Sequence, residues 1–195
     1  MNIGIFVYKD AEVLDFAGPF EVFSTAERAS EVPIELNTFL VGETGAPVAA
    51  RNKFMVTPHY NFSNHPDIDI LIVPGGIHTN EMENVRVLEW LKKVSYKTKI
   101  SASVCTGSFI YAAAKIFVNQ QVTTHWDDID DLRKQFPDLK VKENVRWIED
   151  GKYISSAGIS AGIDMSLHLT GKLFNGALAE KTAHLMDYEW NKKLL

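Results

Sequence analysis

Residues 100–109 read ISASVCTGSF, a run of apolar and small residues that changes character at Cys105. The residues before Cys105 are typical of a buried strand, and residues 109–114, FIYAAA, continue as a helix. A residue on such a sharp strand-to-helix turn is exposed at the end of the sheet. Unpaired N–H groups of the helix N-terminus favour a thiolate there, so Cys105 is a candidate nucleophile. The alternative is a buried structural cysteine that packs as a small apolar side chain.

The rest of the chain alternates between strand-like and helix-like segments, which predicts a parallel sheet covered on both faces. We therefore expect an α/β protein: a flavodoxin-like three-layer α/β/α sandwich with a mostly parallel sheet and a nucleophile elbow at Cys105. The expected strands are residues 2–8, 34–41, 69–73 and 100–104, with hairpins within 43–66 and 141–153. The expected helices begin near Gly18 and Pro19 and then cover residues 80–96, 107–114, 127–136, 160–174 and 177–190.

Composition limits the class of protein. The 195 residues, 46% hydrophobic and 23% charged, fit a single domain over residues 1–195. A net charge of −5 argues against sequence-independent nucleic-acid binding as the main activity. One cysteine excludes an internal disulfide, and the six histidines form no metal-binding pattern. With a strand starting at Asn2 and no membrane-spanning apolar run, we expect no signal peptide, no membrane partner and a cytoplasmic location.

Sites in parallel α/β sheets lie at the carboxyl ends of the strands, and this rule selects a set of residues. Asp15 follows the first strand, Gly75 and Gly76 follow the strand 69–73, and Cys105 follows the next strand. A thiol, a carboxyl group and backbone donors suffice to hydrate or hydrolyse a small electrophile. Cys105 would attack, while the amides of Gly76 and Thr106 would hold negative charge or position a polar substrate atom.

Two of the candidate side chains have simpler alternative roles. Asp15, held between apolar residues, should have a raised pKa and could move a proton to and from the substrate. It could instead cap a helix that begins near Gly18. His125, beside Trp126, could orient or deprotonate Cys105, but a histidine in such a place is more often a packed, hydrogen-bonded structural residue.

Five motifs in order over nearly the whole length are similar to those of the ThiJ/PfpI superfamily, whose fold resembles class I glutamine amidotransferase domains. They are DFAGP (residues 15–19), DILIVPGG (69–76), VCTGS (104–108), TTHW (123–126) and SAGISAGID (156–164). Within this superfamily the chain most resembles isonitrile hydratases and the amidase-like domains of some AraC-type regulators. The chain departs from its relatives at Lys115 and Asn119, where glycines are common, and at residues 51–53.

The assignment of the chain to one branch of the family rests on two positions. Many members place a glutamate after the first strand and a histidine directly after the cysteine, whereas this chain has Asp15 and Thr106 in those regions. The resemblance implies that Cys105 attacks the terminal carbon of an isonitrile and that Asp15 carries the proton. Water would then release an N-formamide. The resemblance also implies a homodimer, and no cofactor is expected because the substrate carbon is already electrophilic.

Other functions remain open on the same scaffold. One is an amidase or a glyoxalase-like enzyme that shares Cys105 and differs in its pocket. Another is a non-enzymatic sensor, since an accessible thiolate of low pKa is readily oxidised. DNA binding in the manner of the AraC-type regulators would need a further helix-turn-helix region, so we expect a small-molecule substrate and no nucleic-acid partner.

Overall fold

A seven-stranded sheet forms the centre of the computed structural model, which describes residues 1–192. Its strand order is β10-β11-β7-β6-β1-β2-β5, and among these strands only the β10–β11 pair is antiparallel. The strands are β1 (Asn2–Phe6), β2 (Asn37–Gly42), β5 (Tyr60–Asn61), β6 (Ile70–Val73), β7 (Ile100–Val104), β10 (Trp147–Asp150) and β11 (Tyr153–Ser156). Two short pairs lie outside the sheet: β3 (Val48–Ala49) with β4 (Met55–Val56), and β8 (Gln121–Val122) with β9 (Lys140–Val141).

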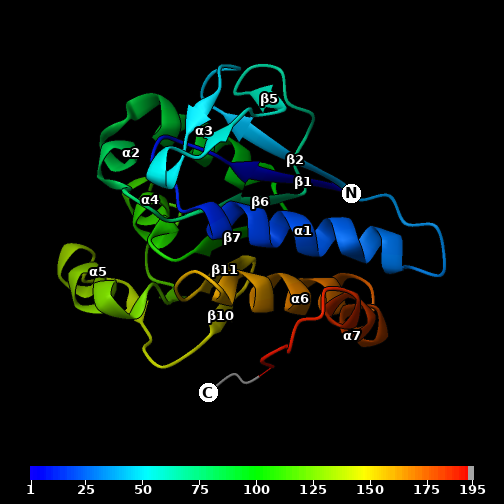
Figure 1. Ribbon diagram of the computed structural model, residues 1–195. Helices are drawn as coiled ribbons and strands as arrows, with labels where there is room; N and C mark the ends of the chain where they lie inside the picture. Colours follow the sequence, from blue (N-terminus) through cyan, green and yellow to red (C-terminus); the bar gives the residue numbers. More distant parts are fainter. Residues whose placement is uncertain (193–195) are drawn as a thin grey trace.

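Helices cover both faces of the sheet, as Figure 1 shows. One layer contains α1 (Val13–Ala29), α6 (Ala161–Leu173) and α7 (Gly176–Leu185), and the other contains α2 (Thr79–Glu83), α3 (Val85–Lys97) and α4 (Gly107–Ala113). A further helix, α5 (Ile129–Gln135), follows the short 3₁₀ turn η2 (Trp126–Asp128), and a second 3₁₀ turn, η1, spans Arg51–Lys53. This arrangement confirms the expected three-layer sandwich. No helix in residues 1–192 is long and apolar enough to cross a membrane.

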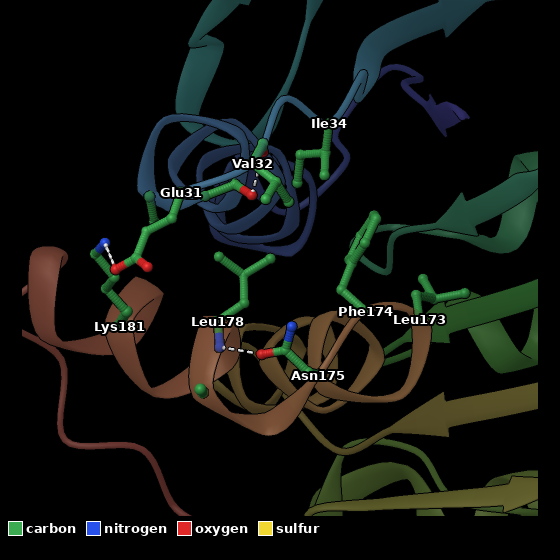
Figure 2. A pocket seen from close by; sticks show the side chains of 11 residues that line it. Glu31, Val32, Ile34, Leu173, Phe174, Asn175, Leu178 and Lys181 are labelled. Atoms are coloured by element: carbon green, nitrogen blue, oxygen red, sulfur yellow. Dashed lines mark hydrogen bonds and ion pairs between the residues drawn. The ribbon is translucent and has the colours of Figure 1, made fainter.

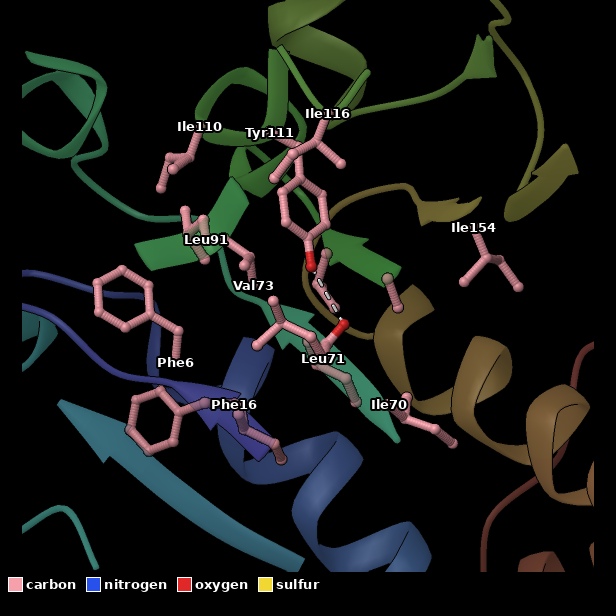
Figure 3. Packing of buried hydrophobic residues seen from close by; sticks show 14 of the residues in the cluster. Phe6, Phe16, Ile70, Leu71, Val73, Leu91, Ile110, Tyr111, Ile116 and Ile154 are labelled. Atoms are coloured by element: carbon pink, nitrogen blue, oxygen red, sulfur yellow. Dashed lines mark hydrogen bonds between the residues drawn. The ribbon is translucent and has the colours of Figure 1, made fainter. Parts of the chain in front are cut away.

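The core lies against the central strands, where β6 and β7 are buried along their whole length. Burial on both faces explains why these strands appear in the sequence as continuous apolar or small runs instead of alternating ones. Figure 3 shows Tyr111 of α4 reaching across the core, where its hydroxyl donates a hydrogen bond to the Leu71 carbonyl at 3.2 Å. This bond satisfies the hydroxyl in an apolar environment and ties α4 to β6.

The first helix begins earlier than expected. It starts at Val13, so Pro19 lies inside the helix and does not mark its start. Asp15 therefore sits in the first turn, and the N-cap residue is Glu12, which makes no side-chain capping bond. The alternative that Asp15 caps a helix starting near Gly18 is wrong. The helix begins before Gly18 because its first turns place Phe16 in the hydrophobic core, and this burial stabilises them.

Other boundaries also differ from the sequence prediction. The helix expected over 80–96 is two helices, because Asn84 leaves helical geometry and caps α3. The hairpin expected over 141–153 is displaced and pairs Trp147–Asp150 with Tyr153–Ser156. The final helix ends at Leu185, short of the expected residue 190.

Asn84 offers a test of the break between α2 and α3. Its side chain accepts hydrogen bonds from the Arg86 and Val87 amides at 3.1 and 3.4 Å. We expect Asn84→Ala to lower the free energy of unfolding by about 1 kcal/mol in urea melts, while Asn84→Ser retains most of the stability. Asn80→Ala, at an exposed position inside α2, is the matched control. Equal losses for Asn80→Ala and Asn84→Ala would contradict the capping role.

Candidate active site

Cys105 occupies a sharp turn between β7 and α4. Its backbone is left-handed, with φ of 53°, a conformation that few residues other than glycine adopt. Its amide is held by the carbonyls of Ser156 and Ala157 at 3.1 and 3.3 Å, at the end of β11. The loop after β6 packs directly against this turn: a Cβ atom on Gly75 would lie 2.9 Å from the Cys105 Cβ. Glycine at position 75 is therefore required by the close approach of the two segments.

The Asp15 carboxyl group lies buried beside this turn, with no exposed surface. Its Oδ2 atom accepts a hydrogen bond from the Gly75 amide at 2.9 Å, whereas Oδ1 makes no hydrogen bond of ordinary geometry with residues 1–192. Burial raises the pKa of Asp15 to about 8, against the opposing effects of the Gly75 bond and the interaction with the Cys105 thiol. The carboxyl group is thus mostly protonated at neutral pH.

The Cys105 thiol is also held in its neutral form. Burial, and next the nearby Asp15 carboxylate, raise the pKa of Cys105 to about 12. The backbone N–H groups of Thr106 and Ile159 act in the opposite direction and favour the thiolate. The residue is only 7% exposed, so desolvation outweighs these donors. The balance of these effects favours the neutral thiol, in contrast to the thiolate expected from the helix N-terminus alone.

The backbone donors around the sulfur differ in part from those expected. The Gly75 amide donates to Asp15, and the Gly76 amide, at a residue with φ of 131°, donates to the Thr106 hydroxyl at 3.0 Å. Both glycine amides are thus engaged by side chains of the protein. Thr106 and Ile159 supply the N–H groups that act on the sulfur. Of these, Thr106 was expected from the sequence, whereas Ile159 was not.

His125 lies at the edge of this group. Its Nδ1 atom is 3.5 Å from Asp128 Oδ2 and accepts a bond from the Asp127 amide at 3.3 Å. Burial raises the pKa of Asp128, and its charge in turn raises that of Cys105. Asp128 was missed from the sequence, although its place three residues after His125 in a turn was a usable signal.

Two further side chains, Tyr8 and His78, border the site. The Tyr8 hydroxyl donates to the Pro74 carbonyl at 3.2 Å, and burial followed by the charge of Asp15 raises the tyrosine pKa. The His78 ring packs on Phe109, and burial lowers the histidine pKa. His78 therefore favours its neutral form. Among residues 1–192, no group of three or more His, Cys, Asp or Glu residues is placed to hold a metal ion.

A separate cavity of about 570 Å³ lies far from Cys105, between the carboxyl-terminal end of α1 and the α6–α7 corner (Figure 2). Val32, Ile34 and Phe174 line it, and an ion pair between Glu31 and Lys181 lies at its side. The run of α1 from Asp15 to this end spans roughly 20 Å. This cavity is therefore no part of the thiol site.

A single cysteine on a strand-to-helix elbow, with a buried carboxyl group from the segment after the first strand, defines a cysteine-centred site on a flavodoxin-like fold. A family model for the DJ-1/PfpI family matches residues 1–172, and the chain belongs to this family. The site residues Asp15, Gly75, Cys105 and Ile159 all fall within the matched range.

Individual relatives cover different branches of the family. The chain is 28% identical to an isonitrile hydratase of Pseudomonas putida, over 96% of this chain and 78% of that protein. It is 30% identical to the HTH-type transcriptional regulator CdhR of Pseudomonas aeruginosa, over 69% of this chain but only 40% of the regulator. Among solved structures, a ThiJ/PfpI family protein from Pseudomonas syringae superposes with a TM-score of 0.87 at 24% identity, over 100% of this chain and 77% of that one.

Burial of Asp15 predicts a specific dependence of stability on pH. The folded protein retains a proton on Asp15 up to about pH 8, whereas the unfolded chain loses it near the ordinary value of 3.8. The contribution of Asp15 to the free energy of unfolding should therefore be greatest below pH 4. It should fall by about 1.4 kcal/mol per pH unit as the pH rises towards 8. Asp15→Asn cannot ionise and should lack this loss.

The measurement is the difference in unfolding free energy between wild type and Asp15→Asn, taken from urea melts between pH 5 and 8. Asp67→Asn, which removes an exposed carboxylate, is the matched control. If the difference in unfolding free energy between wild type and Asp15→Asn stays constant over this range, the Asp15 carboxyl group is already ionised in the folded protein at pH 5, which would contradict the prediction.

Proposed function

We propose that the protein is a cysteine-dependent hydratase that adds water to an isonitrile and releases an N-formamide. The observation that carries this proposal is the pairing of the chain's one thiol, on the elbow, with the buried Asp15 carboxyl group. An isonitrile is small, uncharged and electrophilic at its terminal carbon, which suits an apolar site with a proton carrier. Similarity to an isonitrile hydratase along 96% of the chain supports the same substrate class.

The first half-reaction needs one proton shared between Asp15 and Cys105. The ionised carboxylate takes the thiol proton at Oδ1, the oxygen without a conventional partner. As the proton leaves, the sulfur forms a bond to the terminal isonitrile carbon, and the carboxyl group returns the proton to that carbon. The product is a thioimidate, Cys–S–CH=N–R. The amides of Thr106 and Ile159 stabilise the sulfur while it carries negative charge.

The second half-reaction uses the same carboxylate as a base. Asp15 removes a proton from water, the resulting oxygen adds to the thioimidate carbon, and the proton passes to nitrogen. The tetrahedral adduct then collapses: its hydroxyl proton moves through Asp15 to sulfur, the C–S bond breaks, and a C=O bond forms. The N-formamide leaves and the thiol is restored. Overall the elements of one water are added, with no change of oxidation state that needs a cofactor.

The raised thiol pKa bears on the rival functions. Oxidation by peroxide proceeds through the thiolate, which a pKa near 12 makes scarce at neutral pH. This property disfavours a redox sensor. An amidase or glyoxalase-like enzyme could use the same thiol and carboxyl group, so substrate tests must separate these activities from hydration.

The direct test is to incubate the purified protein with cyclohexyl isonitrile and to follow N-cyclohexylformamide by mass spectrometry. We expect formamide from the wild type and a loss of about three orders of magnitude or more in kcat for Cys105→Ser. Methylglyoxal and a primary amide are the rival substrates, tested in parallel. Turnover of either rival through Cys105, with no formamide formed, would contradict the proposed function.

The shared proton gives a second prediction, for the pH profile. The reactive form has Asp15 ionised and Cys105 protonated, so kcat/KM should rise with pH to a midpoint near 8, where Asp15 ionises. Asp15→Asn should fold, lose at least about 100-fold in kcat/KM and no longer show this rise. A rise with the same midpoint in Asp15→Asn would assign the ionisation to another group.

A further inference from the structure

The Ile159 amide depends on an unusual backbone conformation. Ile159 lies in the segment of residues 157–160 between β11 and α6, and its φ of 38° places a β-branched residue in the left-handed region. Such a conformation costs energy and persists only where the surroundings impose it. The N–H of this residue acts on the Cys105 sulfur and lowers its pKa. The contacts that fix residues 157–160 therefore also fix the position of one N–H donor of the site.

Arg146 holds this segment at two points. Its backbone carbonyl accepts a hydrogen bond from the Ala157 amide at 2.8 Å, and its guanidinium group donates to the Ser160 hydroxyl at 3.4 Å. These two contacts flank Ile159 on both sides. The same guanidinium group donates through Nε to Asp164 Oδ2 at 2.8 Å and forms an ion pair with that carboxylate. A planar guanidinium can make the Ser160 and Asp164 contacts together because its donors are spread over a rigid fork.

Asp164 is in turn fixed from its other side. It lies on α6 with no exposed surface, and its Oδ1 atom accepts bonds from the Tyr188 hydroxyl at 3.1 Å and the Asn191 amide at 3.0 Å. A buried carboxylate with four donors is a rigid anchor for the arginine. The position of the guanidinium is therefore set by α6 and by the segment after α7.

We propose that Arg146 is a positioning residue that keeps the Ile159 N–H directed at the Cys105 sulfur. Its guanidinium group acts through Ser160, and its backbone carbonyl acts through Ala157. Its kinetic consequence rests on the proposed hydratase function, whereas its effect on the Ile159 amide does not. The competing role is a purely structural one, in which the ion pair only stabilises the joining of β10 and α6.

The Arg146→Lys substitution distinguishes these two roles. Arg146→Lys keeps a positive charge beside Asp164, which avoids an unpaired buried carboxylate, but a single ammonium group cannot reproduce the fork that also reaches Ser160. Ser160→Ala removes only the hydroxyl contact and is the second variant. Arg28→Lys, which alters an arginine–glutamate pair on the exposed side of α1, is the matched control.

The first readout is the Ile159 amide resonance in protein labelled with ¹⁵N-isoleucine, which needs no substrate. In the wild-type background, Cys105→Ala should shift this resonance upfield, because the amide loses its sulfur acceptor. In the Arg146→Lys background, Cys105→Ala should shift the Ile159 resonance much less. The shift in the Ser160→Ala background should be intermediate, and the shift in the Arg28→Lys background should equal that in the wild type. An undiminished shift with Arg146→Lys would overturn the proposal, whatever the activity of the protein.

The second readout is the kinetics of the Arg146→Lys variant with the substrate that the wild type turns over. A misdirected donor should lower kcat by about tenfold or more and leave KM almost unchanged. Unchanged kcat with a lowered melting temperature would show a structural role only and overturn the positioning role. If the wild type hydrates no isonitrile, the proposed function fails while the amide measurement still decides the role of Arg146.

Discussion

The burial of a carboxyl group beside a buried thiol is the constraint on which the site depends. Asp15 and Cys105 both lie in a medium that disfavours charge, so burial raises the pKa of each, and the Asp15 carboxylate raises that of Cys105 further. The pair therefore holds two protons at neutral pH and loses the first one near pH 8 from the carboxyl group. The environment that makes the thiol a poor free nucleophile also makes the carboxylate a strong base once it forms.

This arrangement depends on close packing of backbone at the ends of neighbouring parallel strands. The loop after β6 approaches the elbow so closely that only glycine fits at position 75, and the amide of that glycine holds Asp15. The segment after β11 adds the Ile159 donor from the other side. Because β1, β6, β7 and β11 lie near one another in the sheet, residues far apart in sequence meet at one edge.

The sequence was sufficient to predict the sandwich, the elbow and the meeting of Asp15 with Cys105, because these follow from apolar runs and the geometry of parallel sheets. It was insufficient for the charge state of Cys105, since the extent of burial is a tertiary property. It also could not assign Ile159, because a backbone amide carries no signature in the side chain at its position. The start of α1 differs from the prediction for a local reason. Pro19 is typical of a helix start, but the helix begins at Val13, and burial of Phe16 stabilises the turns before Pro19.

The order of the strands also has a consequence for how the chain acquires its reactive centre. Asp15, Gly75, Cys105 and Ile159 are separated from one another by about 60, 30 and 54 positions, and none of their contacts is local. Long-range contacts of this kind form late in folding, because the chain must close large loops before they contribute any stability. An incompletely folded chain would therefore carry an ordinary cysteine with no proton carrier beside it. The contact between Asp15 and Cys105 would therefore report on the fully assembled sheet, in contrast to helix content, which local segments can acquire early.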